Sequence, residues 1–389
     1  MLRIGIITQS PEVQINLDRD LYIKLAKEFK KIYIIDLSFK NKKKIKLPKN
    51  FVFLKPKNTE DVKKIFSKKK FLCFNFLAFN YSNLRLLFLL KKFEIKHFYL
   101  MRSGTIKMNE DLFIKKNNRL NFYFIFLRKI FFKILIIFKF IYNYEILFIS
   151  QKVKKIFYHS KRNQFLNKLF NTNKFFLYNK IIEINDKTYD LNYKHKNSKT
   201  SKIIAFIDTT LNQPGKISSI HKPNEKQKII FYEKLRNFLK LLSKKYKMKL
   251  FICLHPKTSK KEENIYFKGI RCQRYKTSEI IKKSYLNIYL SSTLISESIY
   301  LRKNIILIKS KLLGNFHSYR VNRLIEKFKL NYIDLDITRP YNSIKDLKFL
   351  SENKSLTFKI LSKEINISQK ETGIQRVIKA LKDKKIYKR

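Results

Sequence analysis

Two stretches near the middle of the chain decide its fold: KLFICLHPKT at residues 249–258 and KTSEIIKKSYLNIYLSSTLISESIYLRKNIILIKS at residues 276–310. They contain three short apolar runs with almost no charge, separated by segments with helical spacing. Such runs are typical of parallel strands that are buried on both faces and joined by helices. The predicted strands are Leu250–Leu254, Leu286–Leu290 and Ile305–Ile308.

Polar residues follow two of these strands at the point where each strand ends. His255 and Pro256 come after the first strand, and Ser291, Ser292 and Thr293 come after the second. In an open α/β sheet, ligands bind in the crevice outside the carboxyl ends of the strands. The sequence therefore predicts a ligand site at this edge of the sheet.

The alternation of strands and helices extends over both halves of the chain, and the polar, lysine-rich residues 186–201 separate two series. We expect an α/β fold with two Rossmann-like domains facing across a cleft. The first domain is predicted at 1–190, the second at 201–340, and helices in 341–389 are expected to pack back toward the first domain. The remaining predicted strands are Ile4–Thr8, Lys31–Leu37, Phe51–Leu54, Leu72–Phe79, His97–Arg102, Glu145–Ser150, Ile203–Ile207 and Tyr332–Leu335.

The net charge of +58 comes mostly from lysine, which is spread over every part of the 389 residues. A charge this large is typical of proteins that bind nucleic acid or anionic membranes. Isoleucine, asparagine and phenylalanine are also abundant, while glycine, proline and tryptophan are scarce, which indicates a biased coding sequence. We therefore interpret the charge as a solvated lysine surface and expect no nucleic-acid partner.

The three cysteines, Cys73, Cys253 and Cys272, are odd in number, and the first two lie in apolar runs. This favours buried free thiols in a reducing compartment over disulfides. The histidines show no metal-ligand spacing, so no metal is expected, and no dinucleotide or P-loop motif occurs. The opening residues MLRIGIITQS are a predicted strand rather than a signal peptide, which favours a cytoplasmic protein.

Residues 122–144 form an apolar stretch that four basic residues interrupt: Arg128, Lys129, Lys133 and Lys139. Each charge at the centre of a spanning helix costs about 2.5–3.5 kcal/mol, so a spanning helix is not expected. The charges share one side of a helical wheel, which favours an interfacial helix on the anionic inner face of the cytoplasmic membrane. A helix that packs on the sheet with its basic edge in water stays open as the alternative.

Several residues at the predicted strand ends have side chains suited to nucleotide chemistry. His255, restrained by Pro256, can donate to a phosphate or act as an acid on a leaving group, although a lone histidine is often structural. The hydroxyls of residues 291–293 and the helix that follows form a natural phosphate site, and helix capping is the alternative. Glu297 can accept from ribose hydroxyls, and Asp208 is the candidate base; a solvated helix carboxylate and a turn-capping aspartate are their alternatives.

A strand that ends in His-Pro, followed by a strand that ends in Ser-Ser-Thr and a helix, resembles the nucleotide-binding half of GT-B-fold glycosyltransferases. Over residues 203–310 the chain is most similar to sialyltransferase-like enzymes of bacterial surface-polysaccharide synthesis, which carry HP and Ser/Thr motifs. This resemblance implies that His255 and the hydroxyls of Ser291, Ser292 and Thr293 contact the nucleotide phosphate. The segment ESIYLRKNIIL at 297–307 resembles the EA…GKPVI element of other GT-B enzymes, which implies that Glu297 contacts the ribose.

The resemblance also implies an acidic strand-end motif that supplies the catalytic base. Asp208 in FIDTT would be its counterpart, although the acidic-acidic-Gly form of the motif is absent. We therefore expect a metal-independent glycosyltransferase without a cofactor. It would move a sugar such as a sialic acid from a nucleotide donor to a glycan or lipid-linked acceptor of lipopolysaccharide or capsule. A nucleotide-sugar epimerase, a polyol-phosphate transferase, and a non-enzymatic basic binder of membrane surfaces or nucleic acid are the alternatives.

Overall fold

The computed structural model describes residues 3–11, 14–15, 18–38, 49–67, 71–93, 95–102, 119–150, 178–192, 200–209, 211, 223–337, 354–365, 367 and 370–383. The chain divides into two compact units. Unit 1 holds Met1–Ser103, Leu120–Lys187 and Asn366–Arg389, and Thr188–Ile365 belongs to unit 2.

Unit 1 is built on a seven-stranded sheet in the order β3-β2-β1-β4-β5-β6-β7, in which every pair is parallel. The strand order reverses between β1 and β4, as it does in doubly wound sheets. Isoleucine and phenylalanine dominate the central strands, which are buried over most of their length. The strands are β1 (Arg3–Thr8), β2 (Ile32–Asp36), β3 (Phe51–Leu54), β4 (Phe71–Asn75), β5 (Lys96–Met101), β6 (Tyr144–Ile149) and β7 (Tyr178–Glu183).

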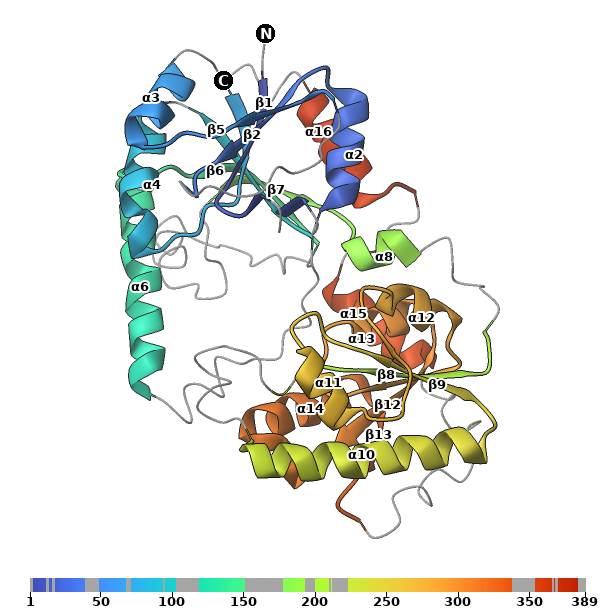
Figure 1. The fold of residues 1–389 in the computed structure, drawn as a ribbon. Coiled ribbons are helices and arrows are strands. Elements are labelled where there is room, and N and C mark those ends of the chain that lie inside the picture. The colour runs from blue at the N-terminus through green and yellow to red at the C-terminus, as the bar shows by residue number, and fades with distance from the viewer. Residues whose placement is uncertain are drawn as a thin grey trace, which may run out of the picture. The chain divides into compact units, whose positions relative to one another are not determined.

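Helices cover both faces of this sheet, as Figure 1 shows. The apolar side chains of α2 (Arg19–Glu28) and α16 (Gly373–Lys382) join one buried cluster with β1 and β4. A second cluster contains side chains of α3 (Thr59–Ser67), α4 (Leu84–Lys91) and α6 (Arg119–Ile137). Two separate clusters require strands that are apolar on both faces, which is why the continuous apolar runs were a reliable signal.

Gly5 lies in the central strand β1, where the neighbouring strand comes unusually close. A Cβ atom at this position would lie 2.7 Å from Sγ of Cys73 and 3.3 Å from the ring of Phe71. These separations are shorter than packed atoms tolerate, so the position requires a residue without a side chain.

The helix α6 differs from the prediction for residues 122–144. It ends at Ile137, and Tyr144 already belongs to β6. Lys133 is buried at 3% exposure, so the expected basic face is not continuous, and the side chain of Lys129 lies outside the described residues. Among the side chains of α6 that the structure describes, large apolar ones are exposed at alternating spacings of three and four residues: Phe124, Leu127, Phe131 and Ile134.

Unit 2 is built on a six-stranded sheet in the order β10-β9-β8-β11-β12-β13, and all of its pairs are parallel. Counted from β8, this is the strand order 3-2-1-4-5-6 of the Rossmann fold. The sheet reverses between β8 and β11. The strands are β8 (Ile203–Ile207), β9 (Lys249–Cys253), β10 (Cys272–Gln273), β11 (Leu286–Tyr289), β12 (Asn304–Lys309) and β13 (Asn331–Asp334).

The helices of unit 2 follow the predicted crossovers (Figure 1). The longest described one, α10, begins with a capping box at Asn224 and buries an apolar face that includes Leu235 and Leu239. Its contacts include α11, while α12 contacts α13, and α14 contacts β12. The helices are α8 (Lys187–Asn192), α10 (Glu225–Lys245), α11 (Lys260–Tyr266), α12 (Thr277–Lys283), α13 (Ile295–Tyr300), α14 (Gly314–Phe328) and α15 (Lys354–Glu364).

The C-terminal part of the chain is divided between the two units. The helix α16 contacts α2 within unit 1. The helix α15 instead contacts α13 and α14 within unit 2, where Leu361 and Ile365 are buried. The expectation that all helices of 341–389 pack toward the first domain is therefore wrong for α15. The predicted α/β class with two Rossmann-like domains is confirmed by the two parallel sheets.

Candidate functional site

The predicted site residues of unit 2 lie at the carboxyl edge of its sheet. Asp208 follows β8, His255 follows the end of β9, and Ser291 follows the end of β11. Because β8 and β11 are the neighbours between which the strand order reverses, this edge contains the topological switch point. The structure thus brings these three residues to the place where doubly wound sheets bind ligands.

His255 is half-buried, and the turn after β9 fixes the hydrogen bonding of its ring. Its Nδ1 atom accepts the backbone N–H of Lys257 at 3.1 Å. In the neutral ring the proton is therefore on Nε2, which is left as a donor. Burial lowers the pKa of His255, the charge of Lys257 lowers it further, and the charge of Asp208 opposes this. At neutral pH the residue is thus a neutral hydrogen-bond donor.

Asp208 is buried at 3% exposure, and hydroxyl groups engage both of its carboxylate oxygens. Tyr232 donates to Oδ1 at 3.2 Å, and Thr258 donates to Oδ2 at 2.8 Å. The backbone N–H of His255 also approaches Oδ2 at 3.5 Å. These contacts join β8, α10 and the turn after β9, so the carboxylate holds the turn that carries His255.

A second contact to the same turn comes from Arg274, a residue that the sequence analysis missed. Arg274 follows β10, and its Nη1 donates to the carbonyl oxygen of Thr258 at 2.6 Å. Its Nη2 forms an ion pair with Glu263 at 2.9 Å. Because β10 has only two residues, the sequence shows no apolar run there, and the position of Arg274 at a strand end could not be predicted.

Ser291 is buried, and its hydroxyl lies 3.1 Å from Nδ1 of His317 in α14. Burial lowers the pKa of His317 to about 4, and the charge of Arg320 contributes. The imidazole is therefore neutral at pH 7. The hydroxyl of Ser291 is thus already hydrogen-bonded to His317. No sequence pattern predicts this contact between residues 26 positions apart.

Ser292 and Thr293 are more accessible than Ser291: the former is half-buried and the latter is exposed. The hydroxyl of Ser292 accepts the backbone N–H of Leu294 at 3.3 Å. The helix that follows, α13, has six residues, and no side chain caps its N-terminus. A helix this short adds little dipole, so the hydroxyls are the main polar groups of this segment.

Glu297 is buried at 2% exposure, and both of its oxygens accept hydrogen bonds. Asn192 donates to Oε1 at 3.1 Å, and Ser278 donates to Oε2 at 2.9 Å. Burial raises the pKa of Glu297, while these two bonds and the charge of Lys282 oppose the rise. The residue therefore ties α8, α12 and α13 together, and the sequence did not predict either partner.

In unit 1, the carboxyl end of β5 carries a buried ion-pair cluster that the sequence analysis also missed. Arg102 is 3% exposed and binds both oxygens of Asp20, at 3.0 and 2.8 Å. Asp18 lies 3.9 Å from the same guanidinium. Burial raises the pKa of Asp18 despite the opposing charge of Arg102. Asp18 and Asp20 form an Asp-x-Asp pair that serves an arginine here.

Other features of the described residues bear on the predicted chemistry. No group of three His, Cys, Asp or Glu side chains in the described ranges could hold a metal ion. Cys73, Cys253 and Cys272 are free thiols, and the first two are buried. None of the helices that the structure describes is long and apolar enough to cross a membrane.

No family model and no curated protein sequence matches the chain. A UDP-glucosyltransferase from Polygonum tinctorium, capable of glucosylating indoxyl, is 9% identical with a TM-score of 0.51, covering 100% of this chain and 98% of its own. The UDP-GlcNAc 2-epimerase of Neisseria meningitidis is 12% identical with a TM-score of 0.46, covering 98% and 99%. MurG of Acinetobacter baumannii is 8% identical with a TM-score of 0.46, covering 98% and 99%. The first match supports a GT-B-like fold over the whole chain.

Proposed function

We propose that the protein is a glycosyltransferase that takes its sugar from a nucleotide donor held at the carboxyl edge of the unit 2 sheet. The observation that carries this proposal is His255: its Nδ1 is occupied by the backbone of its own turn, which leaves Nε2–H as a donor. The proposal is supported by the strand order: His255 follows β9, which neighbours β8, one of the two strands at the switch point.

The role proposed for His255 is to donate to the phosphate that departs when the sugar is transferred. Negative charge grows on that phosphate in the transition state, so a fixed donor stabilises the transition state more than the ground state. Asp208, Thr258 and Arg274 keep the turn in place, which makes His255 preorganised. Pro256 adds to this because its ring restricts the backbone of the same turn.

The hydroxyls of Ser292 and Thr293 are the proposed further contacts to the phosphate, because they are the more accessible ones. The hydroxyl of Ser291 instead contacts His317. Glu297 can accept from a ribose hydroxyl only if it gives up a present hydrogen bond, such as the one from Asn192. Asp208 is proposed to position the turn, since both of its oxygens are engaged.

The finer identity of the reaction rests on the resemblance of the strand-end motifs. It favours a sialic-acid-like sugar as the donor group and a lipid-linked glycan of lipopolysaccharide or capsule as the acceptor. We also propose that transfer requires no metal ion, because His255 and the hydroxyls can offset part of the phosphate charge.

A membrane-bound acceptor requires the enzyme to reach the lipid surface, and α6 is the proposed contact. Its exposed aromatic and aliphatic side chains, such as Phe124 and Leu127, suit the boundary between headgroups and acyl chains. The large positive charge of the chain suits the anionic inner face of the cytoplasmic membrane. Membrane binding is therefore expected to depend mainly on the exposed apolar residues of α6 and less on the salt concentration.

Nucleotide binding tests the core of the proposal. Titration calorimetry with CMP, CDP, UDP and GDP should show saturable binding of at least one nucleotide at constant ionic strength. His255→Ala should weaken that binding about tenfold and reduce sugar transfer by about 10²–10³-fold. Lys257→Ala is the matched control, because it leaves intact the backbone N–H that contacts His255. Absence of binding by all four nucleotides would contradict the proposal.

The products distinguish transfer from the alternative of epimerisation. With a bound nucleotide sugar and no acceptor, an epimerase changes the sugar itself, which proton NMR of the donor detects directly. A transferase leaves the intact donor unchanged until an acceptor is added. Conversion of the donor into an epimer would replace the proposed function.

Flotation with anionic vesicles tests the membrane contact. Combined replacement of Phe124, Leu127 and Phe131 by serine should abolish flotation. Serine at Ile229, Ile230 and Leu241, exposed apolar residues of α10, is the matched control and should leave flotation intact. Equal flotation of both variants would remove α6 from the proposal.

A further inference from the structure

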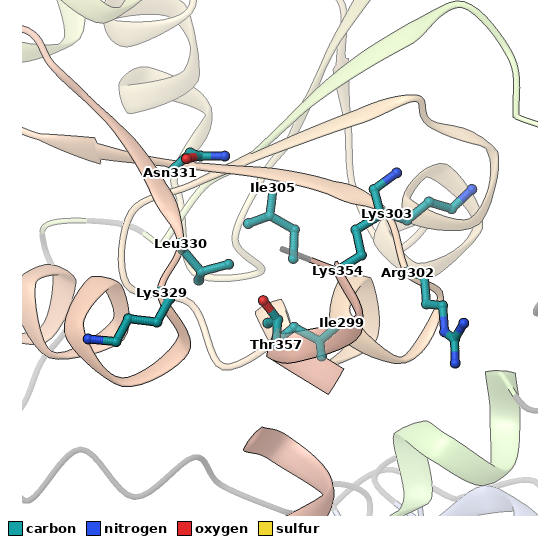
Figure 2. Close-up of a pocket in the computed structure, with 9 residues that line it drawn as sticks. All are labelled: Ile299, Arg302, Lys303, Ile305, Lys329, Leu330, Asn331, Lys354 and Thr357. Atoms are coloured by element: carbon teal, nitrogen blue, oxygen red, sulfur yellow. The ribbon is translucent and has the colours of Figure 1, made fainter. Parts of the chain in front are cut away.

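Polar groups that the proposed function does not use occur in both units. In unit 2, residues such as Lys303 and Lys354 line a small pocket beside the entrance of β12 and β13 (Figure 2). Its cavity volume of about 20 Å³ corresponds to about one water molecule, so no substrate group fits there. In unit 1, by contrast, the ion-pair cluster at Arg102 lies at the carboxyl edge of the sheet, where doubly wound sheets bind ligands.

Arg102 and Ser150 are neighbours at this edge. Arg102 follows β5 and Ser150 follows β6. The backbone N–H of Ser150 donates to the carbonyl of Met101 at 3.0 Å. Side chains alternate between the two faces of a strand, and Leu100 and Phe148 pack in the apolar cluster that contains α2. Arg102 and Ser150 therefore lie on that same face, where α2 begins.

Arg102 is already paired with Asp20, which leaves Asp18 outside the ion pair. Both terminal nitrogens of the guanidinium bind Asp20, at 3.0 and 2.8 Å. Asp18 comes no closer to the guanidinium than 3.9 Å, which is too long for a hydrogen bond. Gln14 donates to Oδ2 of Asp18 at 2.7 Å, whereas Oδ1 accepts no hydrogen bond from the residues that the structure describes. The side chain of Asp18 is 13% exposed, so a substrate can reach it.

Asp18 does not serve as a helix cap either. It occupies the N-cap position of α2, where an aspartate usually accepts the N–H of the second or third helical residue. Its side chain makes no such hydrogen bond. Neither helix capping nor a hydrogen-bonded ion pair therefore accounts for a carboxylate at this position.

The two carboxyl groups of the cluster have different charge environments. Burial raises the pKa of Asp18, and the charges of Arg102 and Lys187 oppose the rise without cancelling it. Burial also acts to raise the pKa of Asp20, but the hydrogen bond and the charge of Arg102 lower it overall. One carboxyl group thus takes up a proton more readily than its neighbour, an arrangement that divides acid and base roles in enzymes. The charged and titratable groups that face Asp18 are Asp20 and Tyr22 of α2, Tyr99 and Arg102 at β5, and Lys187.

The hydroxyl of Ser150 is a second polar group at this edge whose bonding the described residues do not complete. Ser150 is fully buried, and its Oγ has no hydrogen-bond partner among the described residues. Buried polar groups nearly always have a partner, so this hydroxyl indicates a site that a bound molecule or a water completes. A ligand rich in hydroxyl groups, such as a sugar, can supply that partner.

We propose that the carboxylate of Asp18 accepts the proton of the acceptor hydroxyl during sugar transfer, an assignment that rests on the proposed function. The acceptor oxygen forms a bond to the anomeric carbon of the donor sugar while the bond from that carbon to the phosphate oxygen breaks. The electron pair of the broken bond leaves with the nucleotide, and the proton moves to Asp18 and then to water. Burial favours this step because it converts an incompletely compensated carboxylate into a neutral acid. Both oxygens of Asp208, the base expected from the sequence, are already engaged.

Urea unfolding at pH 7 tests whether Asp18 is structural, without any substrate. Asp20→Asn removes the partner of a buried guanidinium and should clearly lower the urea midpoint. Asp18→Asn keeps that ion pair and can still accept from Gln14, so its midpoint should stay close to that of the wild type. Equal losses in the two variants would overturn the proposal, because Asp18 would then be a structural carboxylate.

Nucleotide release from sugar nucleotides tests the proton transfer. CMP-N-acetylneuraminic acid, UDP-N-acetylglucosamine and GDP-mannose serve as donors, with water or sodium azide as the acceptor at constant ionic strength. Attack by water requires the loss of a proton, whereas azide has none to lose. Asp18→Asn should therefore slow release in water by about 10²–10⁴-fold, and azide should restore release to the level of the wild type in azide. Asp61→Asn changes a carboxylate in the first turn of α3; it is the matched control and should behave as the wild type with both acceptors.

The outcomes separate this assignment from the proposed function. If Asp18→Asn releases nucleotide in water as fast as the wild type, the assignment is wrong and the proposed function stands. Loss of release with both water and azide also overturns the assignment, because the residue would then act on donor binding or on the fold. A wild type that releases nucleotide from none of the donors contradicts the proposed transfer, and the assignment with it.

Discussion

The contacts of Asp208 lead to a prediction that separates a structural carboxylate from a catalytic base. Tyr232→Phe and Thr258→Val each remove one hydroxyl that donates to the buried carboxylate. A hydrogen bond to a charged group contributes about 1.5–3 kcal/mol to stability. The bond from Thr258 is 2.8 Å long and that from Tyr232 is 3.2 Å, so Thr258→Val should lie nearer the upper value. Neither residue is a candidate for acid-base chemistry.

The free energy of unfolding in urea is the direct measurement, made for each variant alone and combined with Asp208→Asn. Because the hydroxyls act through the carboxylate, the effects in Asp208→Asn should be much smaller, which a double-mutant cycle reports as coupling. Tyr275→Phe is the control, since Tyr275 is 82% exposed and its hydroxyl faces water. It should change the free energy of unfolding by less than about 0.5 kcal/mol.

The same variants report on the turn that carries His255. Thr258 also donates its backbone N–H to the carbonyl of His255 at 3.0 Å, so the turn and the carboxylate form one unit. Thr258→Val should therefore weaken nucleotide binding as well as folding. The structural role of Asp208 is wrong if Tyr232→Phe and Thr258→Val both keep the wild-type free energy of unfolding while Asp208→Asn abolishes only turnover. Asp208 would then be the catalytic base.

Four further predictions follow from buried groups and from the proposed chemistry. The pKa of His317 is lowered to about 4, so between pH 6.5 and 4 the imidazole binds a proton in the unfolded protein but not in the folded protein. The free energy of unfolding should therefore fall by roughly 3 kcal/mol over that range, and urea unfolding of His317→Gln should show no such fall. The pKa of Glu297 is raised, so its stabilising contribution is present below the ordinary pKa and is lost as pH rises; the free energy of unfolding of the wild type should fall from pH 4.5 to pH 7, Glu297→Gln should lack this slope although it loses one accepted hydrogen bond at every pH, and equal slopes would contradict the assignment. Gly5→Ala should lower the free energy of unfolding by about 1–3 kcal/mol through its contact with Cys73, and adding Cys73→Ala should recover part of the loss, whereas no recovery would place the strain elsewhere. Nucleotide binding and sugar transfer should persist in EDTA, and their loss with recovery on adding Mg²⁺ would show that a metal ion is needed.

The strands of the fold were predictable because continuous apolar runs have few other uses in a chain this polar. β3 and β8 were predicted with the observed bounds, Phe51–Leu54 and Ile203–Ile207. The strand β7 was not predicted because its sequence YNKIIE mixes polar and apolar residues. The strand β10 was not predicted because two residues are too few to show an apolar pattern. The exposed face of α6 was also out of reach, since a helix that is apolar nearly all round does not reveal which side meets the sheet.

The position of the candidate site was predictable, but the state of its side chains was not. Strand ends of a parallel sheet meet at one edge, so His255 and Ser291 could be placed there from sequence alone. Whether a carboxylate at that edge is open or occupied depends on distant residues. Asp208 meets Tyr232 from α10, and Glu297 meets Asn192, which is 105 residues away. Such pairings follow from tertiary packing and leave no local pattern.

The placement of α16 in unit 1 has a consequence for the order in which the two halves of the protein can mature during translation. Thr188–Ile365, which include the strands β8 to β13 of the unit 2 sheet, leave the ribosome before α16 is made. The apolar face formed by α2 and β1 stays uncovered until α16 arrives, because Ile374, Val377 and Leu381 complete its cluster. Unit 1, although most of it is encoded first, can therefore complete its folding only after unit 2 has been synthesised. During that time the apolar face of α2 and β1 is exposed on the nascent chain.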